Sequence, residues 1–242
     1  MATTYLQLVN EVLREHNEVE LTSSNFSTAR GVHSRAKDAV NVAIRQMGLH
    51  ETRWPWYAME HTQVLTKGTY EYAWPDNFKI PDWNSFQIQI DSNVSITRPI
   101  TLHPIERDEW YRYRRDDDET DTTDGRGVPK YVFQTHGDGY GVSPNPDAAY
   151  TIKFRYYKYT TALSAHDDTM DIPDQYKDVV TFGASKVLYR MLDGVQYSMV
   201  LDEDFQTLLD DMRQILVNDE LEVYSGFIPR GSRASSKYTN RW

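Results

Sequence analysis

The densest group of residues that could do chemistry is an acidic run in the middle of the chain. The run covers residues 116–119, and Asp121 and Asp124 follow it. Carboxylate oxygens at this density suit a calcium ion. The spacing departs from an EF-hand loop, because Thr120 stands where a third acidic or amide ligand belongs and Asp121 stands where the glycine belongs. We therefore favour a solvated, flexible loop, and calcium binding remains the alternative hypothesis.

The other groups with chemical potential are scattered. Seven histidines occur singly, without a His-Glu-x-x-His spacing, so we expect no metal site. The glycines of residues 137–141 resemble a phosphate-binding loop, but Ser143 and Pro144 follow them instead of a helix N-terminus, which favours a hairpin turn. The chain has no cysteine, which excludes disulfides, thiolate catalysis and cysteine-based zinc sites. We expect no catalytic residue and no cofactor, and hence no enzyme.

Two segments, residues 110–115 and 154–159, mix aromatic with basic side chains. Such mixtures can stack on single-stranded bases. In the second segment, strand alternation places most aromatic and basic side chains on opposite faces, which favours ordinary sheet packing. The first segment adjoins the acidic run, which would repel phosphates. For both segments ordinary packing is therefore favoured over nucleic-acid binding, which stays an alternative.

The last part of the chain differs from the rest in charge. From Ser225 onward it carries four basic residues and no acidic one, with aromatic and aliphatic residues between them. Such a segment suits an arm that orders on a partner protein and supplies apolar anchors. A disordered tail is the alternative, and four charges would give nucleic acid only weak, salt-sensitive affinity. The candidate partner-binding residues are Phe227, Ile228, Arg230, Arg233, Lys237, Tyr238, Arg241 and Trp242.

Helical periodicity occurs at both ends of the chain. Residues 3–16 and 34–47 carry apolar stripes, with Thr3 or Thr4 capping the first helix, Ser34 capping the second and Gly48 ending it. A third stripe follows Pro173 and ends at the Asp193-Gly194 pair. A fourth stripe runs over residues 205–216, with Asp202 as its cap.

The middle of the chain alternates with the period of a strand. The clearest strand places Tyr150, Ile152, Phe154 and Tyr156 on one face. Shorter strands are expected at residues 70–74, 86–90, 94–100 and 130–135, joined by polar turns. This pattern predicts a compact antiparallel β domain, either a sandwich or a small barrel.

The predicted fold class is α+β. No amphipathic helix can bury its stripe alone, so we expect the helices from both chain ends to meet in one four-helix bundle. The β domain is then an insertion, and the C-terminal arm extends from the bundle. The expected boundaries are 1–53 and 162–222 for the bundle, 54–161 for the β domain and 223–242 for the arm.

Composition sets further limits. The first residues lead straight into a helical pattern, so we expect no signal peptide, and no apolar run is long enough to predict a transmembrane helix. The formal net charge of -10 argues against a protein that coats nucleic acid over its whole surface. The 17 Tyr and 6 Trp provide large apolar areas that tolerate a wet edge, as partner surfaces do.

Several short segments, taken in order, resemble the head-to-tail adaptor (tail tubular protein A-like) family of short-tailed bacteriophages. The resemblance begins in the opening helix, continues through Trp54-Pro55-Trp56, and ends where Ile172-Pro173 opens the third helix. The segments that carry it are residues 5–15, 37–41, 54–56, 129–133, 143–147, 156–158, 163–164, 167–168 and 172–176.

The resemblance implies a structural virion protein at the head-tail junction, made in the host cytoplasm. It implies a ring, commonly of twelve copies, between the portal protein and the tail nozzle protein. Double-stranded DNA would pass through the ring without specific binding, and no membrane is involved. It also implies that a C-terminal extension contacts the portal, which assigns that role to residues 225–242. An acidic surface facing the lumen would keep DNA sliding.

Two other functions remain open from the residues alone. One is a nucleic-acid-binding protein that uses the basic arm and the aromatic strands, which a salt-dependent shift of DNA would favour. The other is a carbohydrate-binding virion module that uses exposed Trp and Tyr, which glycan binding by the middle domain would favour.

Overall fold

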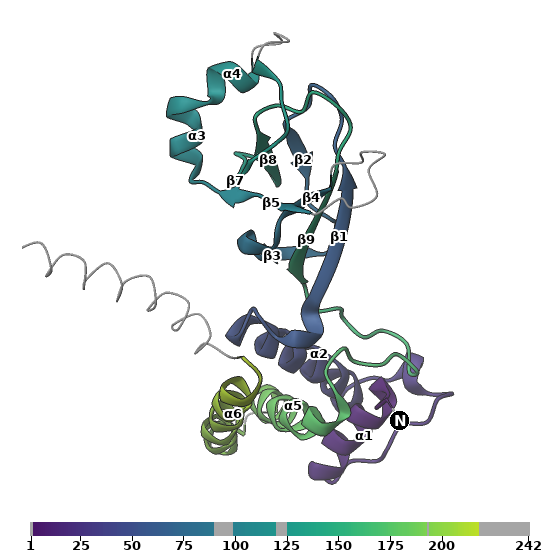
Figure 1. Ribbon diagram of the computed structural model, residues 1–242. Helices are drawn as coiled ribbons and strands as arrows, with labels where there is room; N and C mark the ends of the chain where they lie inside the picture. Colours follow the sequence, from purple (N-terminus) through teal and green to yellow (C-terminus); the bar gives the residue numbers. More distant parts are fainter. Residues whose placement is uncertain (1, 90–98, 120–124, 193, 218–242) are drawn as a thin grey trace, which may run out of the picture. The chain divides into compact units, whose positions relative to one another are not determined.

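The computed structural model describes residues 2–89, 99–119, 125–192 and 194–217 (Figure 1). These residues form two compact units. The helical unit contains the described residues of Met1–Trp56 and Thr160–Trp242, and the β unit spans Tyr57–Tyr159. Each unit buries apolar side chains of its own.

Most described residues of the helical unit lie in long helices. These are α1 (Tyr5–Glu15), α2 (Val32–His50), α5 (Lys177–Met191) and α6 (Val195–Leu216), with short 3-10 turns at Phe26–Thr28 and Asp174–Tyr176. The prediction that Thr4 caps α1 is confirmed: Thr4 Oγ1 accepts the Gln7 N–H at 3.3 Å, and Gln7 Oε1 accepts the Thr4 N–H at 2.9 Å. This reciprocal capping box fixes where the helix begins.

The class is α+β, but the predicted four-helix bundle from both chain ends is wrong. Helix α5 is central and packs against α1, α2 and α6 (Figure 1). It is buried on nearly all sides, including its polar residues Thr181, Ser185 and Lys186. Helix α6 covers one side of α5 and leaves an outer face exposed. The unit is therefore an arrangement around one helix, not four equivalent helices around a shared axis.

Two predicted helix starts are also wrong. Helix α2 begins two residues before Ser34, after Gly31, whose φ of 63° suits glycine. Helix α6 begins at Val195, directly after Gly194, so Asp202 lies inside the helix. Instead of capping, the Asp202 carboxylate pairs with Lys186 Nζ of α5 at 2.9 Å.

Helices α2, α5 and α6 meet closely at Gly183. A Cβ atom at Gly183 would lie 2.6 Å from the ring of Phe205 and 3.1 Å from Cβ of Ala43. Phe205 comes from α6 and Ala43 from α2, so the missing side chain lets three helices approach at one point. Lys186 Nζ lies 4.4 Å from the centroid of the same Phe205 ring. These contacts hold α6 against α5.

His16 closes the end of α1 against α5. Its ring lies 4.0 Å from the ring of Tyr189, and its buried Nε2 finds no hydrogen-bond partner among the described residues. Burial lowers the pKa of the imidazole below its ordinary value, although a hydrogen bond to the backbone of Ser185 and the charge of Glu18 oppose this shift. The folded protein therefore favours the neutral ring.

We expect the helical unit to lose stability as the pH falls through about 6.5 toward the lower folded-state pKa of His16. The unfolded chain binds the proton more readily, so protonation favours unfolding. The free energy of unfolding, measured by urea titration between pH 5 and 8, should depend less on pH in His16→Gln than in the wild type. His33→Gln is the matched control, because that ring contacts the Val19 carbonyl oxygen at the surface. Equal pH dependence in the wild type and His16→Gln would contradict the assignment.

The β unit contains two sheets. The first has the order β1-β9-β4-β5, with β3 also paired to β9, and the second has the order β2-β8-β7-β6. Neighbouring strands are antiparallel except β6 and β7, which are parallel. The strands are β1 (Ala58–Val64), β2 (Glu71–Ala73), β3 (Phe78–Pro81), β4 (Gln87–Gln89), β5 (Ile100–Thr101), β6 (His103–Pro104), β7 (Tyr131–Gln134), β8 (Gly139–Ser143) and β9 (Thr151–Lys158).

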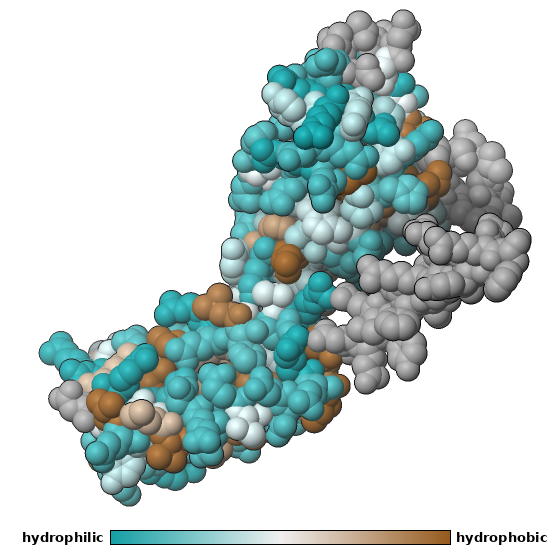
Figure 2. All heavy atoms as spheres, turned by 90° about the vertical axis from the view of Figure 1, so that its left-hand side faces the viewer, coloured by the Kyte–Doolittle hydropathy of each residue, from teal (hydrophilic) through white to brown (hydrophobic). Residues whose placement is uncertain are grey.

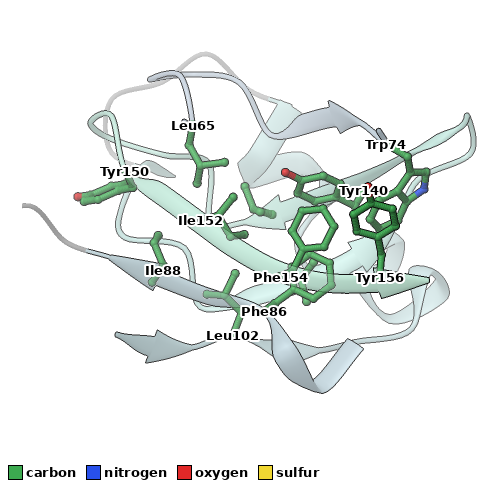
Figure 3. Close-up of a cluster of buried hydrophobic side chains, with 12 residues drawn as sticks. Leu65, Trp74, Phe86, Ile88, Leu102, Tyr140, Tyr150, Ile152, Phe154 and Tyr156 are labelled. Atoms are coloured by element: carbon green, nitrogen blue, oxygen red, sulfur yellow. The ribbon is translucent and has the colours of Figure 1, made fainter. Parts of the chain in front are cut away.

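A cluster of aromatic and aliphatic side chains from both sheets forms the core of the β unit (Figure 3). Phe86 and Phe154 stack at 4.5 Å between ring centroids, and the Tyr140 and Phe154 rings meet edge to face at 5.2 Å. Trp74 stacks on Phe78 at 4.0 Å. Aromatic rings thus supply much of the area that a small two-sheet unit must bury.

Two short helices of the β unit were not predicted. They are α3 (Arg107–Tyr113) and α4 (Arg115–Glu119). Trp110 of α3 stacks on Phe133 of β7 at 4.4 Å and is almost fully buried. Trp110 is the one buried residue of α3, which explains why the segment shows no clear apolar stripe.

Candidate interaction surface

The described residues hold no group of three or more His, Asp or Glu side chains placed to bind a metal ion. The same part of the chain contains no helix long and apolar enough to cross a membrane. Residues 120–124, which complete the acidic segment considered for calcium, lie outside the described residues.

Asp118 corrects the expectation that the acidic run is a solvated loop. Its side chain is buried, Oδ2 accepts the indole N–H of Trp110 at 2.7 Å, and Oδ1 accepts the backbone N–H of Asn145 at 2.9 Å. Burial raises the pKa of this carboxyl, while hydrogen bonds from Ser143, Trp110 and Asn145 and the charge of Arg114 oppose the shift. Asp118 therefore fixes α4 to the loop at Asn145, and its oxygens are already engaged with protein donors.

The two aromatic and basic segments are largely committed to the β unit. In β9 the side chains of Ile152, Phe154 and Tyr156 are buried, and Arg155 on the other face pairs with Asp82 at 3.0 Å. This confirms the predicted alternation. In the first segment Trp110 is buried, the Arg114 guanidinium lies 3.9 Å from the Tyr131 ring centroid, and Arg115 pairs with Glu119 at 2.9 Å.

A carbohydrate-binding module would need tryptophans at its surface, but three tryptophans of this chain are buried. They are Trp54, Trp74 and Trp110, each less than a tenth exposed. Trp54 donates its indole N–H to the Met47 carbonyl at 2.9 Å, so its polar edge is also engaged.

A cleft of about 500 Å³ lies between α1 and the start of α5. Its charged side chains face one another: Lys177 Nζ pairs with Glu11 at 2.7 Å, and Arg14 pairs with Glu20 at 3.0 Å. Asp174 accepts hydrogen bonds from the backbone and hydroxyl of Thr3 at 2.6 and 2.8 Å. These contacts join the N-terminal segment to the start of α5.

The first two turns of α6 expose several large apolar side chains. Val195, Tyr197, Met199 and Val200 are between 57% and 70% exposed, and Ile215 near the other end of α6 is 75% exposed. Figure 2 shows the molecule from the left-hand side of Figure 1, where α6 is drawn. Apolar side chains are visible on this face of the helical unit. We call residues 195–201 the apolar turns of α6.

The opposite side of α6 is firmly held. Ser198, Phe205, Leu209 and Met212 are buried. Near its end, Arg213 Nε donates to the Glu51 carboxylate at 2.7 Å, and His50 Nε2 lies 3.2 Å from Asp210 Oδ1. Helix α6 thus presents its apolar turns from a fixed position, as an interface requires.

Sequence reasoning missed the apolar turns, because apolar residues on all sides of a helix show no 3.6-residue period. The signal was present in the composition, because five of the seven residues at 195–201 are apolar. Contiguous exposed apolar side chains mark an interaction site, so these turns are a candidate contact surface. The predicted partner-binding residues of the arm, Phe227–Trp242, lie outside the described residues, so their role stays a prediction.

Comparison with known proteins places the chain in a family. The family model described as SU10 adaptor protein matches residues 3–230. The match covers both units and nearly the whole length of the chain. No curated protein matches the chain.

Proposed function

Because the chain belongs to the SU10 adaptor protein family, we propose that it forms a ring between the portal and the tail nozzle of a bacteriophage, through which DNA passes. Family membership makes the protein a structural adaptor of the phage virion, which associates with other virion proteins such as those of the portal and tail. We further propose that the protein is of the short-tailed, tail tubular protein A-like type, that its ring holds twelve copies, and that it lies at the head-tail junction.

The apolar turns of α6 support this proposal best. Four apolar side chains at one helix end, Val195, Tyr197, Met199 and Val200, are more than half exposed. Contiguous apolar surface on a folded chain marks an interaction site. In a ring every copy repeats the same contact, so modest surfaces become strong through multivalency.

The net charge of the chain supports a channel for DNA. At -10 per chain, a ring of many copies would present a strongly negative surface. Like charges keep DNA from adhering to the wall, so the duplex can slide. We propose that the lumen is acidic, and a ring structure with a predominantly basic lumen would contradict this.

We further propose that the arm, residues 225–242, binds the portal. Its candidate contacts are Phe227, Ile228, Arg230, Arg233, Lys237, Tyr238, Arg241 and Trp242. The four cations would steer the arm to an acidic groove, and the aromatic side chains would anchor it there.

The full chain and a chain that lacks residues 225–242 are each incubated with portal rings and examined by negative-stain microscopy and co-sedimentation. We expect an added ring of density with the full chain and a loss of roughly a hundredfold in apparent affinity without the arm. Circular dichroism should show that the shortened chain keeps the helical signal of the full chain. Normal assembly of the shortened chain on portals would contradict the role of the arm.

A matched pair of variants separates the two contributions of the arm. Replacing Arg230, Arg233, Lys237 and Arg241 with glutamine should weaken portal binding and reduce its dependence on salt. Replacing Phe227, Tyr238 and Trp242 with alanine should weaken binding at every salt concentration, because anchors act through buried area.

A further inference from the structure

One flank of α6 carries a regular line of apolar and acidic side chains. Leu201, Leu208 and Ile215 recur at seven-residue spacing, and Asp204 and Asp211 recur at the same spacing beside them. Seven residues are close to two helical turns, so each set forms a line almost parallel to the helix axis. Leu201 and Leu208 are half-buried and Ile215 is 75% exposed, so the line borders the buried stripe and continues into solvent.

This flank faces away from α2 of the same chain. The contacts between α6 and the end of α2 are made by Asp210, with His50, and by Arg213, with Glu51. At 100° per residue, Asp210 and Arg213 lie on one side of the buried stripe, and the line of Leu201, Leu208 and Ile215 lies on the other. Within a single chain, α2 therefore leaves this flank uncovered.

Helix α2 carries a similar line on its outer side. This line lies on the side opposite the buried alanines of α2, and its residues are spaced by alternating steps of three and four. They are Arg35, Asp38, Val42, Arg45 and Leu49. Leu49 is 67% exposed, Arg35 and Arg45 are exposed, and Val42 is half-buried. Beside this line runs a groove of about 260 Å³, lined in part by Asp38, Val42 and Arg45 of α2 and by residues 160–162.

The two lines complement each other. Each places apolar residues seven positions apart with a charged residue between them, acidic on α6 and basic at Arg45 on α2. Within the described parts of the chain, Asp204, Asp211 and Arg45 take part in no ion pair. A partner would therefore gain both apolar burial and charge pairing.

We propose that the flank of α6 in one copy packs on the outer face of α2 in the next copy of this chain. Leu208 and Ile215 pack against Val42 and Leu49, and Asp204 or Asp211 pairs with Arg45. This contact joins two different surfaces, so it is heterologous and repeats around a closed ring. The inference rests on the proposed function, because it names the surfaces that build the ring.

The absence of cysteine from the chain allows a direct test. Val42→Cys and Leu208→Cys are prepared as separate proteins, mixed with portal rings present, and treated with a flexible bismaleimide. We expect a crosslinked dimer from the mixture and none from either variant alone. Rings without this crosslink, or self-crosslinking of either variant, overturn the proposal. If mass photometry shows no oligomer with or without portal rings, the proposed ring itself fails, which is a separate result.

Charge reversal gives an independent readout. Arg45→Glu alone, and Asp204→Lys with Asp211→Lys, should each raise the concentration needed for assembly by about tenfold or more, because like charges then face each other. Combining all three substitutions in one chain should restore assembly. Glu203→Lys is the matched control, since this exposed residue lies on the other side of α6, and it should assemble like the wild type. Failure of the combined variant to recover, while it remains folded by circular dichroism, contradicts the pairing.

Discussion

Replacement of Phe205 by alanine should lower the free energy of unfolding of the helical unit by about 3–5 kcal/mol. The Phe205 ring is 1% exposed and fills the space that Gly183 leaves between α5 and α6. Its loss leaves a cavity at the point where three helices meet. It also removes the aromatic face beneath Lys186, whose Nζ lies 4.4 Å from the ring centroid. Few single substitutions in this unit remove as much packed area.

Urea unfolding followed by far-ultraviolet circular dichroism measures this effect on the helices. Ile215→Ala is the matched control, because Ile215 is on the same helix but 75% exposed. The control should change the stability of the free chain by about 0.5 kcal/mol or less. A change below about 1 kcal/mol in Phe205→Ala would show that α6 is held by its ion pairs rather than by packing.

Replacement of Asp118 by alanine should lower the free energy of unfolding of the β unit by about 2–4 kcal/mol. The substitution leaves two buried donors without acceptors, the indole N–H of Trp110 and the backbone N–H of Asn145. It also frees α4 from the loop at Asn145. Glu109→Ala is the matched control, since Glu109 is exposed and adjacent to Trp110, and we expect it to change stability by only a few tenths of a kcal/mol.

The pH dependence distinguishes Asp118 from an ordinary surface carboxylate. Because burial raises the pKa of Asp118 in the folded state, the folded chain holds this proton more tightly than the unfolded chain. Stability from this group is therefore greatest below the unfolded pKa and falls as the pH rises through the folded pKa. The difference in unfolding free energy between the wild type and Asp118→Ala, measured by urea titration between pH 3 and 7, should shrink as pH rises. A constant difference would contradict the shift.

The elements that the sequence predicted best are those whose pattern depends only on local geometry. Alternation placed Ile152, Phe154 and Tyr156 on one face of a strand, and β9 buries all three. Thr3 or Thr4 was predicted as the cap of the first helix, and Thr4 makes a capping box with Gln7. In both cases a single element determines which side chains lie inside.

Features that depend on partners elsewhere in the chain were missed. Trp110 is the one residue of α3 that is buried, through a ring stacked on Phe133, so the sequence of the helix carries no repeated stripe. Asp118 looked like one of several solvated acids, because its two donors come from Trp110 and Asn145, eight and 27 positions away. Sequence spacing does not show which carboxylate of a run turns inward.

The predicted bundle failed for a related reason. An apolar stripe shows which face of a helix is buried, but it does not show how many neighbours the helix has. The buried Ser185 and Lys186 of α5 are the residues that reveal its central place, and their partners, Glu15 and Asp202, lie on α1 and α6. The candidate site was hidden similarly, because the apolar turns of α6 have no polar side to make them periodic.

The exposed apolar turns of α6 also bear on the life of a newly made copy before assembly. A folded chain that carries such a surface is prone to self-association as its concentration rises in an infected cell. The net charge of -10 opposes this by mutual repulsion over roughly the 8 Å screening length of physiological salt. If the chain builds a ring as proposed, we expect short-range attraction and longer-range repulsion together to keep single copies dispersed until a template recruits them. The same charge that suits a DNA channel would thus provide the colloidal stability of the unassembled protein.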